Sequence, residues 1–275
     1  ADRIGLVIRD NNGEYVLING NQIVMIFLNY LMTRNIELGT LTGNEYIVKT
    51  IVTTETIRTI AEAQHIKMYD CFTGFKWIAN VMRENEGKAR YLGGGEESYG
   101  FLAEDFVRDK DSVSAISLMA EIAAWAKDKG LNMTDMLIDI YMKYGFSREK
   151  SISLVRKGKS GAEEIIALMK QFRENPPKEI AGSPVVTVKD FQSLVETNVA
   201  TGETKKLDMP ATSNVLQYYT ADRTKVSVRP SGTEPKIKFY IEVHDTLASA
   251  DEYKATEARA DEKINRIAKE FGITK

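Results

Sequence analysis

Apolar positions in the first half of the chain form short runs that alternate with longer segments of helical spacing. The short runs predict strands at residues 4–8, 14–18, 45–52, 66–71 and 89–92. The longer segments predict helices at residues 22–31, 55–63, 76–83 and 113–129. Alternating strands and helices favour a parallel sheet covered by helices. We therefore expect an α/β domain over residues 13–130, with three layers, a mostly parallel sheet and helices on both faces.

Polar residues at the starts of these helices predict where each helix begins. A side-chain oxygen there can accept a hydrogen bond from the free N–H groups of the first turn. Asn19 or Asn21 can cap the first helix, and Thr54 can cap the second. Asp111 or Ser112 precedes the fourth. The first helix is apolar nearly all round, which is typical of a buried helix.

Residues 131–180 combine helical segments with turns, and we expect a helical connection there. Ser160 and Glu163 form a capping-box pattern, in which each side chain bonds the other residue's backbone N–H. The buried face of that helix is predicted from its apolar residues, Ile165, Ile166, Leu168, Met169 and Phe172. The Asn-Pro-Pro sequence at residues 175–177 ends the helix and is a candidate hinge into the last domain.

The pattern changes after residue 180, where short apolar runs follow one another with brief connections. Strands are predicted at residues 185–188, 214–219, 226–228 and 237–243, and a final helix at 249–271. Closely spaced strands favour antiparallel pairing. We expect residues 181–275 to form an α+β domain whose antiparallel sheet is covered by helices.

Composition excludes several classes of protein. The 275 residues are 43% hydrophobic and 28% charged, with a formal net charge of −2, so no basic excess points to a nucleic-acid partner. No apolar run reaches the length that spans a membrane. The single cysteine, Cys71, excludes an intramolecular disulfide and fits a reducing compartment, so we expect a cytoplasmic protein. No feature of the sequence indicates an obligate protein partner.

The loop between the predicted strands at 226–228 and 237–243 concentrates groups that bind phosphate. Arg229 offers a planar fork that matches two phosphate oxygens. Ser231 and Thr233 offer hydroxyl donors, and Gly232 allows a sharp turn of the backbone. The alternative interpretation is a tight connection between two strands, in which proline and glycine only shape the turn.

A glycine-rich acidic loop, residues 93–100, follows another predicted strand. Ligands bind at the carboxyl ends of parallel strands, and Glu96 and Ser98 could bond sugar hydroxyls there. A flexible acidic turn is the alternative. Thr73 and Gly74 also follow a strand and open a helix, so their N–H groups could face an anion or a sugar, or form an ordinary turn.

These two loops resemble motifs of the α-D-phosphohexomutases, the phosphoglucomutase and phosphomannomutase family. Residues 229–235, Arg-Pro-Ser-Gly-Thr-Glu-Pro, are similar to the phosphate-binding loop of the last of that family's four domains. Residues 95–98 match its sugar-binding pattern, Gly-Glu-x-Ser. Ala1, Asp2 and Arg3 match the last three positions of its metal loop, Asp-Gly-Asp-x-Asp-Arg. Residues 1–12 would then end the preceding, metal-loop domain.

The resemblance implies a role for each matching residue. Glu96 and Ser98 would bind hexose hydroxyls, in a site that the Thr73–Gly74 turn lines. The phosphate that is not reacting would be held by Arg229, Ser231, Gly232 and Thr233. Lys110, in a stretch similar to the family's Arg-x-Lys-Asp, would act on the reacting phosphoryl group, while Asp2 would be a magnesium ligand with Arg3 beside it.

The resemblance further implies a mutase that interconverts hexose 1-phosphate and hexose 6-phosphate through a phosphoserine and a bisphosphate intermediate, with Mg²⁺. Glu97, and Gly100 in place of a histidine, favour the glucose branch. A phosphomannomutase or phosphopentomutase is the alternative among enzymes. A non-catalytic phosphosugar-binding module is the alternative of another class.

The family's nucleophilic serine has no counterpart here, because neither histidine is followed by asparagine and no Ser-His-Asn-Pro sequence occurs. The chain also begins within the metal-loop motif. We therefore expect a C-terminal fragment of a mutase that binds phosphosugar weakly, does not turn it over and holds no stable Mg²⁺. Asp2 and Arg3 are expected to form a solvated or disordered terminus.

Overall fold

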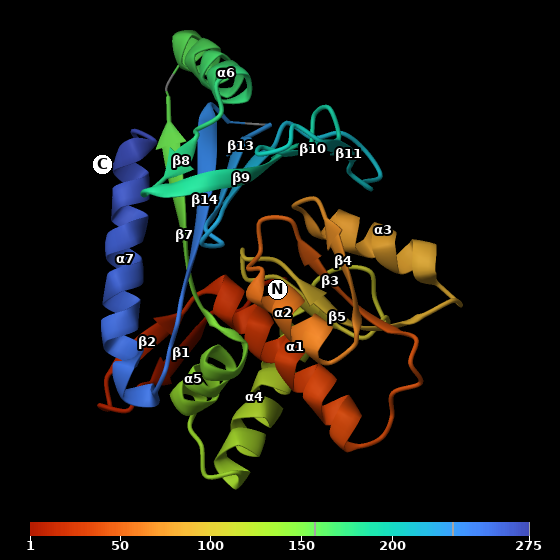
Figure 1. Ribbon diagram of the computed structural model, residues 1–275. Coiled ribbons are helices and arrows are strands. Elements are labelled where there is room, and N and C mark those ends of the chain that lie inside the picture. Colours follow the sequence, from red (N-terminus) through yellow and green to blue (C-terminus); the bar gives the residue numbers. More distant parts are fainter. Residues whose placement is uncertain (157, 233, 275) are drawn as a thin grey trace. The chain divides into compact units, whose positions relative to one another are not determined.

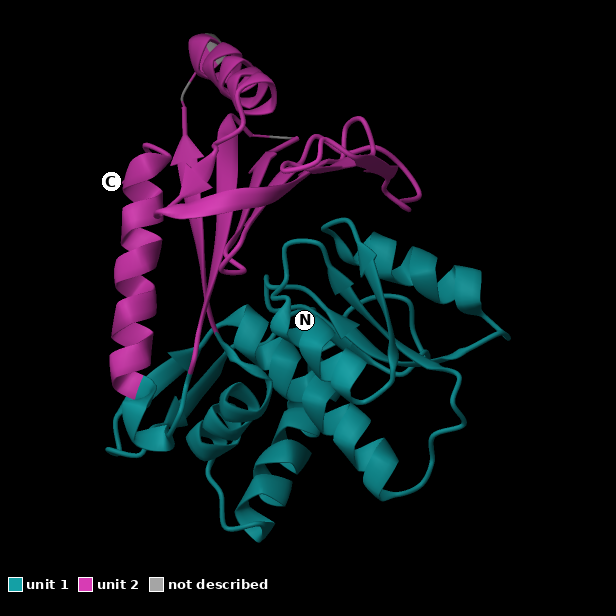
Figure 2. Ribbon diagram, in the orientation of Figure 1, with its two compact units in different colours: residues 1–146, 247–253 teal, residues 147–246, 254–275 magenta. Residues whose placement is uncertain are grey.

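The computed structural model describes residues 1–156, 158–232 and 234–274, and its residues divide into two compact units. Unit 1 comprises residues 1–146 and 247–253, and unit 2 comprises residues 147–246 and 254–275 (Figure 2). The chain therefore passes between the units at residues 146/147, 246/247 and 253/254.

Unit 1 contains the alternating elements that the sequence predicted. In chain order they are β1 (Leu6–Arg9), β2 (Tyr15–Ile18), α1 (Gly20–Glu37), β3 (Glu45–Thr50), α2 (Thr56–Ala63), β4 (Lys67–Cys71), α3 (Phe75–Asn85), β5 (Arg90–Gly95), β6 (Phe101–Ala103), α4 (Ser112–Asp128) and α5 (Met133–Tyr144). Strands β1 and β2 form an antiparallel pair of their own. The other four make a sheet in the order β4-β3-β5-β6, in which β3 is parallel to β4 and β5, and only β6 is antiparallel.

Helices cover both faces of this sheet (Figure 1). On one face, Tyr46 and Val48 of β3 pack with Phe75 and Ile78 of α3. Successive side chains of a strand point to opposite faces. Accordingly Leu102 of β6 joins the α3 cluster, while its neighbour Phe101 stacks on Phe27 of α1 with ring centroids 4.2 Å apart. The expected three-layer, mostly parallel α/β architecture is confirmed.

Local capping explains where several helices begin. Asn19 caps α1, since its side chain accepts from the backbone N–H of Gln22, and the Gln22 side chain accepts in return from Asn19. Asp111 caps α4 in the predicted way. Helix α2 begins at Thr56, whose N–H donates to Thr54 Oγ1 at 3.3 Å. The N-cap residue of α2 is Glu55, which makes no side-chain capping bond, so side-chain oxygens cap α1 and α4 but not α2.

The remaining elements of the chain lie mostly in unit 2. These elements are β7 (Phe146–Val155), α6 (Gly158–Glu174), β8 (Glu179–Ile180), β9 (Ser183–Asp190), β10 (Val195–Asn198), β11 (Thr204–Lys206), β12 (Leu216–Thr220), β13 (Lys225–Pro230), β14 (Lys236–Asp245), the 3₁₀ turn η1 (Ala250–Glu252) and α7 (Tyr253–Glu270). The sheet order is β11-β10-β9-β12-β13-β14-β7, with β8 attached to β9. The central neighbours pair antiparallel, as the sequence predicted.

Helix α6 and the end of α7 cover one face of that sheet through aromatic side chains. The ring centroid of Phe172 in α6 lies 5.9 Å from that of Phe239 in β14. The ring centroids of Phe271 and Phe172 are 5.6 Å apart. Tyr218 of β12 joins them and donates its hydroxyl to the carbonyl of Phe172 at 2.9 Å. This cluster confirms an antiparallel sheet covered by helices.

Four details of the middle segment differ from expectation. Residues 131–180 were predicted to be a helical connection but contain the ten-residue strand β7. Its charged residues 148–150 interrupt the apolar alternation by which a strand is recognised in a sequence. Helix α6 begins at Gly158, so Ser160 lies inside its first turn and the capping-box prediction is wrong. Ile166 is 70% exposed, not buried. Residues 175–177 lie within unit 2 rather than at its border.

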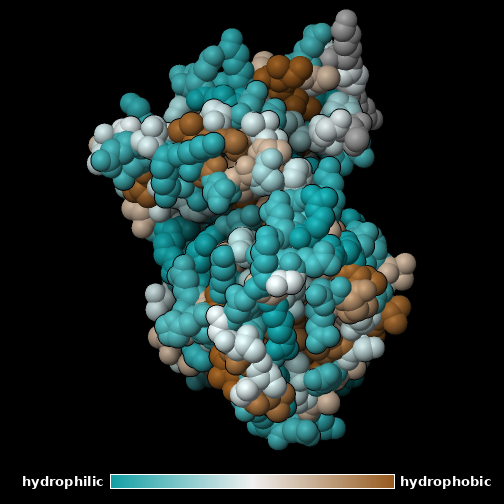
Figure 3. All heavy atoms as spheres, turned by 90° about the vertical axis from the view of Figure 1, so that its right-hand side faces the viewer, coloured by the Kyte–Doolittle hydropathy of each residue, from teal (hydrophilic) through white to brown (hydrophobic). Residues whose placement is uncertain are grey.

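The surface is mostly polar on the face that Figure 3 shows, where apolar groups are scattered among hydrophilic ones. Within the described ranges, no helix combines the length and the apolar character that crossing a membrane requires.

Candidate functional site

Glu96 lies at the carboxyl end of β5, where the sequence predicted a sugar-binding loop. Its side chain is buried, and Oε2 accepts a hydrogen bond from the N–H of Gly74 at 2.9 Å. The loop closes on itself, since the N–H of Glu96 donates to the carbonyl of Gly100 at 2.9 Å and the N–H of Tyr99 donates to the carbonyl of Glu96 at 3.1 Å. The carboxylate is therefore held on the turn that precedes α3.

The backbone of Gly74 explains that contact. Its φ of 106° lies in the region that favours glycine, and it stands at the N-cap position of α3. N–H groups at a helix start are free to bond an anion and carry partial positive charge. The sequence left open whether this N–H faces a ligand or belongs to an ordinary turn; in the structure it bonds the carboxylate of Glu96.

Lys110 lies beside the same loop. A Cβ at Gly100 would come 2.8 Å from Lys110 Cδ and 3.1 Å from Glu96 Oε1, so the lysine stem and the carboxylate meet at this glycine. The ammonium lies 3.2 Å from Asp2 Oδ2 and 3.1 Å from Asp109 Oδ1. Burial tends to lower the pKa of Lys110, but the hydrogen bonds that its ammonium donates to Asp109 and Asp2 outweigh it and raise the pKa overall. Lys110 thus stays cationic.

The first residues of the chain run along these loops. The carbonyl of Ala1 accepts from the N–H of Ser112, and the N–H of Ile4 donates to the carbonyl of Tyr99, both at 3.3 Å. The hydrogen bond from Lys110 is the main cause of a lowered pKa for Asp2. Asp2 and Arg3 are exposed, as expected of a solvated terminus, but Asp2 is ion-paired rather than free.

The donors present do not make a magnesium site by themselves. Magnesium takes six oxygen ligands, of which a protein commonly supplies one or two carboxylates while water and substrate phosphates supply the rest. Across residues 1–156, 158–232 and 234–274, no group of three or more His, Cys, Asp or Glu side chains is placed to hold a metal ion. Asp2 offers a single carboxylate, and Lys110 already pairs with it.

The predicted phosphate loop joins β13 to β14 in unit 2. The N–H of Ser231 donates to the carbonyl of Lys236 at 2.8 Å, which closes the loop. Arg229 is half-buried at the end of β13. A Cβ at Gly232 would meet nothing within 4 Å, so space is open there. The fourth predicted residue, Thr233, lies outside the described residues.

Sequence reasoning missed two neighbours of Lys110. Asp109 pairs with the ammonium, and the Phe75 ring centroid lies 5.6 Å from it. Asp109 is adjacent in the charged stretch 108–111, and Phe75 follows the Thr73–Gly74 turn, so both motifs contained the signal. Ser98 is half-buried in the loop that Glu96 begins.

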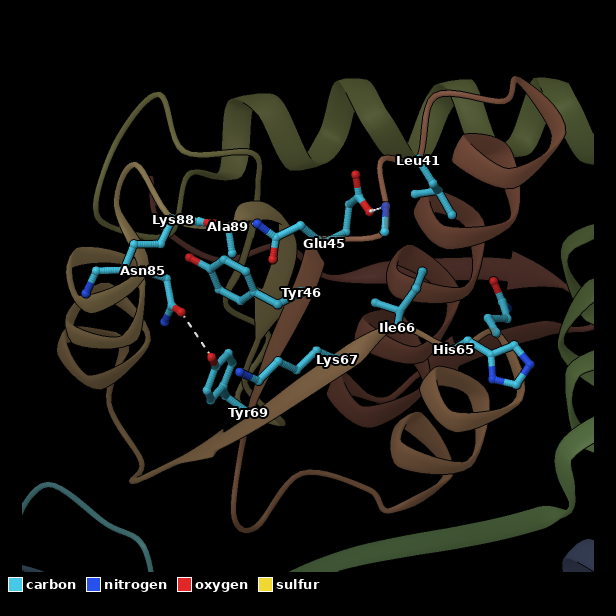
Figure 4. A pocket seen from close by; sticks show the side chains of 13 residues that line it. Leu41, Glu45, Tyr46, His65, Ile66, Lys67, Tyr69, Asn85, Lys88 and Ala89 are labelled. Carbon is cyan, nitrogen blue, oxygen red and sulfur yellow. Dashed lines mark hydrogen bonds between the residues drawn. The ribbon is translucent and has the colours of Figure 1, made fainter.

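A cavity of about 480 Å³ lies at the other edge of the sheet, where β3 and β4 begin (Figure 4). Tyr46, Lys67 and Tyr69 line it, with the Tyr69 hydroxyl donating to Asn85 Oδ1 at 3.0 Å. None of the site residues that the sequence predicted is in this lining. The candidate site is therefore at the carboxyl edge, where parallel sheets bind ligands.

Two family models match the chain. Residues 19–144 match phosphoglucomutase/phosphomannomutase α/β/α domain III, and residues 173–260 match the C-terminal domain of the same family. Among curated proteins, the chain is 36% identical over 241 residues to a phosphoglucomutase of Staphylococcus epidermidis and 35% identical to one of Staphylococcus aureus. Each match covers 88% of this chain and 43% of the relative, so the chain spans less than half the length of these relatives.

Solved structures agree on the fold. The phosphoglucomutase parafusin of Paramecium superposes with a TM-score of 0.62 at 18% identity, over 98% of this chain and 44% of that chain. A putative phosphomannomutase of Thermus thermophilus gives 0.56 at 16% identity, over 96% of this chain and 44% of that chain. Because two domain models of one family match the chain in succession, the chain belongs to the phosphoglucomutase/phosphomannomutase family.

Proposed function

We propose that this chain supplies the sugar-binding and phosphate-binding parts of a phosphoglucomutase, which interconverts glucose 1-phosphate and glucose 6-phosphate. The observation that carries the proposal is the meeting of Glu96 and Lys110 at Gly100, at the carboxyl edge of the sheet. A carboxylate accepts hydrogen bonds from sugar hydroxyls, and an ammonium beside it stabilises charge on a phosphoryl group. The Staphylococcus relatives are phosphoglucomutases, which supports the choice of reaction.

We assign two groups of residues to different parts of the ligand. Glu96 and Ser98 bond hydroxyls of the hexose, while Arg229, Ser231, Gly232 and Thr233 hold the phosphate that is not reacting. Either phosphate of a bisphosphate could occupy the phosphate loop in turn. Lys110 faces the transferring phosphoryl group.

Magnesium belongs to this proposal only for the full-length enzyme, where it would neutralise charge on the transferring group. The residues here do not fit the ion alone, so no step is assigned to it. The sequence contains no Ser-His-Asn-Pro motif. We therefore expect no turnover from these 275 residues in a coupled assay with Mg²⁺ and glucose bisphosphate, and robust turnover would contradict the assignment.

Calorimetry with the 275-residue chain tests the proposal. Glucose 1-phosphate and glucose 6-phosphate should both bind saturably, more tightly than glucose or inorganic phosphate alone. Arg229→Ala should weaken binding by about 1.5–3 kcal/mol, the usual contribution of a hydrogen bond to a charged group. The matched control is Arg266→Ala, an exposed arginine of α7. Equal binding by both variants would remove Arg229 from the site.

Titrating mannose and ribose phosphates in parallel separates the alternatives. Preference for mannose phosphate favours a phosphomannomutase, and preference for ribose phosphate a phosphopentomutase. If the gene encodes no residues before Ala1, the same binding data describe a non-catalytic phosphosugar-binding module.

A further inference from the structure

We propose that Glu97 is a positioning residue, which fixes the sugar-binding loop to the turn between β3 and α2 and does not touch the sugar. The inference deepens the proposed function and rests on it for the identity of the ligand. The sequence placed Glu97 at a variable position of the motif, where its identity favoured the glucose branch.

The carboxylate of Glu97 bonds two threonine hydroxyls. Oε2 accepts from Thr50 Oγ1 at 3.2 Å and from Thr53 Oγ1 at 3.4 Å. The two hydroxyls also lie 2.8 Å apart, so the three groups form one cluster. Both threonines are completely buried. The low local dielectric around buried groups strengthens their hydrogen bonds, which suits a structural attachment.

The turn that carries these threonines is itself held firmly. Lys49 of β3 is fully buried, and its ammonium lies 3.0 Å from Glu55 Oε1 and 2.8 Å from Asp70 Oδ1. The same ammonium donates to the carbonyl of Thr53 at 3.4 Å. A buried charge is stable only when it is paired and hydrogen-bonded. Lys49 therefore anchors the turn from β3 to α2, and through it the two hydroxyls.

The loop is also confined on the side of α1. A Cβ at Gly20, the first residue of α1, would lie 1.9 Å from the carbonyl oxygen of Glu97. The helix start and the loop backbone are thus in direct contact. The backbone of Glu97 is held by α1, and its side chain by the β3–α2 turn.

The adjacent residues Glu96 and Glu97 consequently have different roles, since Glu96 binds the sugar and Glu97 holds the loop in place. Glu96 Oε2 bonds Gly74 and its Oε1 lies near Gly100, on the side of Lys110. Glu97 is half-buried and bonds the threonine hydroxyls of the β3–α2 turn instead. A shift of about 1 Å in a binding group can cost about a hundredfold in rate, so attachment of the loop governs how well Glu96 meets a sugar.

Hydrogen exchange of the 275-residue chain tests the attachment without any sugar. In Glu97→Ala, amides of residues 96–103 should exchange about tenfold faster, as expected for the loss of a side-chain hydrogen bond. Glu97→Gln keeps an oxygen that accepts from the threonines and should stay near the wild-type rate. Thr50→Val with Thr53→Val should match Glu97→Ala. Thr134→Val, which removes a buried hydroxyl elsewhere in unit 1, is the control. Unchanged exchange in Glu97→Ala would overturn the proposal.

Calorimetry with glucose 6-phosphate supplies the second measurement. Glu97→Ala should bind about tenfold more weakly and Glu97→Gln nearly as well as wild type, because an acceptor rather than a charge is needed. If Glu97→Gln binds as weakly as Glu97→Ala while its exchange stays normal, Glu97 contacts the sugar and the proposal is wrong. If exchange behaves as expected but wild type binds no phosphosugar, the proposed function fails and the attachment stands.

Discussion

Two neighbouring carboxylates illustrate how residue chemistry depends on surroundings. Glu96 and Glu97 have identical side chains, yet Glu96 accepts from a backbone N–H at a helix start and Glu97 from buried threonine hydroxyls. Both residues lie in the turn that follows β5, where their side chains bond different neighbours. Glu96 Oε1 and the stem of Lys110 meet at Gly100, so we expect Glu96 to bind a ligand.

Glu96→Gln should therefore affect selectivity more than folding. The amide keeps one acceptor for Gly74 but loses the charge that strengthens bonds from sugar hydroxyls. We expect binding of glucose 6-phosphate to weaken by about 1–2 kcal/mol and the preference over mannose 6-phosphate to shrink. Calorimetry on both sugars measures this. Glu62→Gln, on the exposed side of α2, is the control, and an unchanged ratio with unchanged affinity would make Glu96 structural.

At the scale of elements, the start of α1 has to fit closely against another loop. Alanine favours a helix over glycine by about 1 kcal/mol, so propensity alone predicts that Gly20→Ala stabilises the chain. The added Cβ would meet the Glu97 carbonyl at 1.9 Å, a backbone atom that cannot move away as a flexible side chain can. Overpacking of this kind costs about 1–3 kcal/mol, so the steric effect should dominate.

Gly20→Ala should thus lower the free energy of unfolding in a urea titration. Gly5→Ala is a matched control, because a Cβ there meets nothing within 4 Å, and its effect should stay within about 0.5 kcal/mol. Equal stability of the two variants would show that the loop moves aside freely, which would also weaken the proposed attachment of Glu97.

A second element contact, between the β12–β13 turn and α7, makes unit 2 sensitive to acid. Lys263 Nζ donates to Asp222 Oδ2 at 2.6 Å, and the N–H of Thr224 donates to Oδ1 at 3.3 Å. Partial burial tends to raise the pKa of Asp222, but the hydrogen bonds from Lys263, Thr220 and Thr224 prevail and hold it well below its usual range.

Because the pKa of Asp222 is lowered on folding, its contribution to stability is present above about pH 4 and is lost as the pH falls through the folded-state value. Asp222→Asn should lower the free energy of unfolding by about 1 kcal/mol at pH 7, a small value because the side chain is 42% exposed. The difference from wild type should vanish at the acid end of a pH series. Asp208→Asn, also exposed in unit 2, should show no such trend.

At the scale of the whole molecule, the units do not follow the sequence-predicted border. Residues 175–177 looked like a hinge because Asn-Pro-Pro ends a helix, but α6 before it and the strands after it belong to the same unit. Phe172 and Phe271 are the reason, since they pack together on the sheet from opposite ends of the domain's sequence.

A fragment of residues 178–275 should therefore fail to fold cooperatively, because it lacks both α6 and the edge strand β7. A fragment of residues 147–275 contains all of unit 2 and should fold. Dispersion of amide signals in NMR spectra and a cooperative thermal transition distinguish the two. A well-folded 178–275 fragment would restore the border at residues 175–177.

Local patterns in the sequence determined much of the fold. Periodicity located the main helices and strands, because burial on one face repeats about every 3.6 or 2 residues. Asn19 and Asp111 predicted where two helices begin, because a capping side chain bonds backbone groups only two or three residues away. The sequence did not predict strand β7, because charged residues interrupt its apolar pattern. It did not predict β11, because all the residues of that strand are exposed.

Motif chemistry named Glu96 and Lys110, but only the tertiary structure decided what they touch. Glu96 bonds Gly74, 22 residues away, and Glu97 bonds Thr50, 47 residues away. Such contacts depend on which strand ends lie together in the sheet order β4-β3-β5-β6. Sequence spacing does not encode that order, because it arises when the strands pair and bury their faces against α1 and α3.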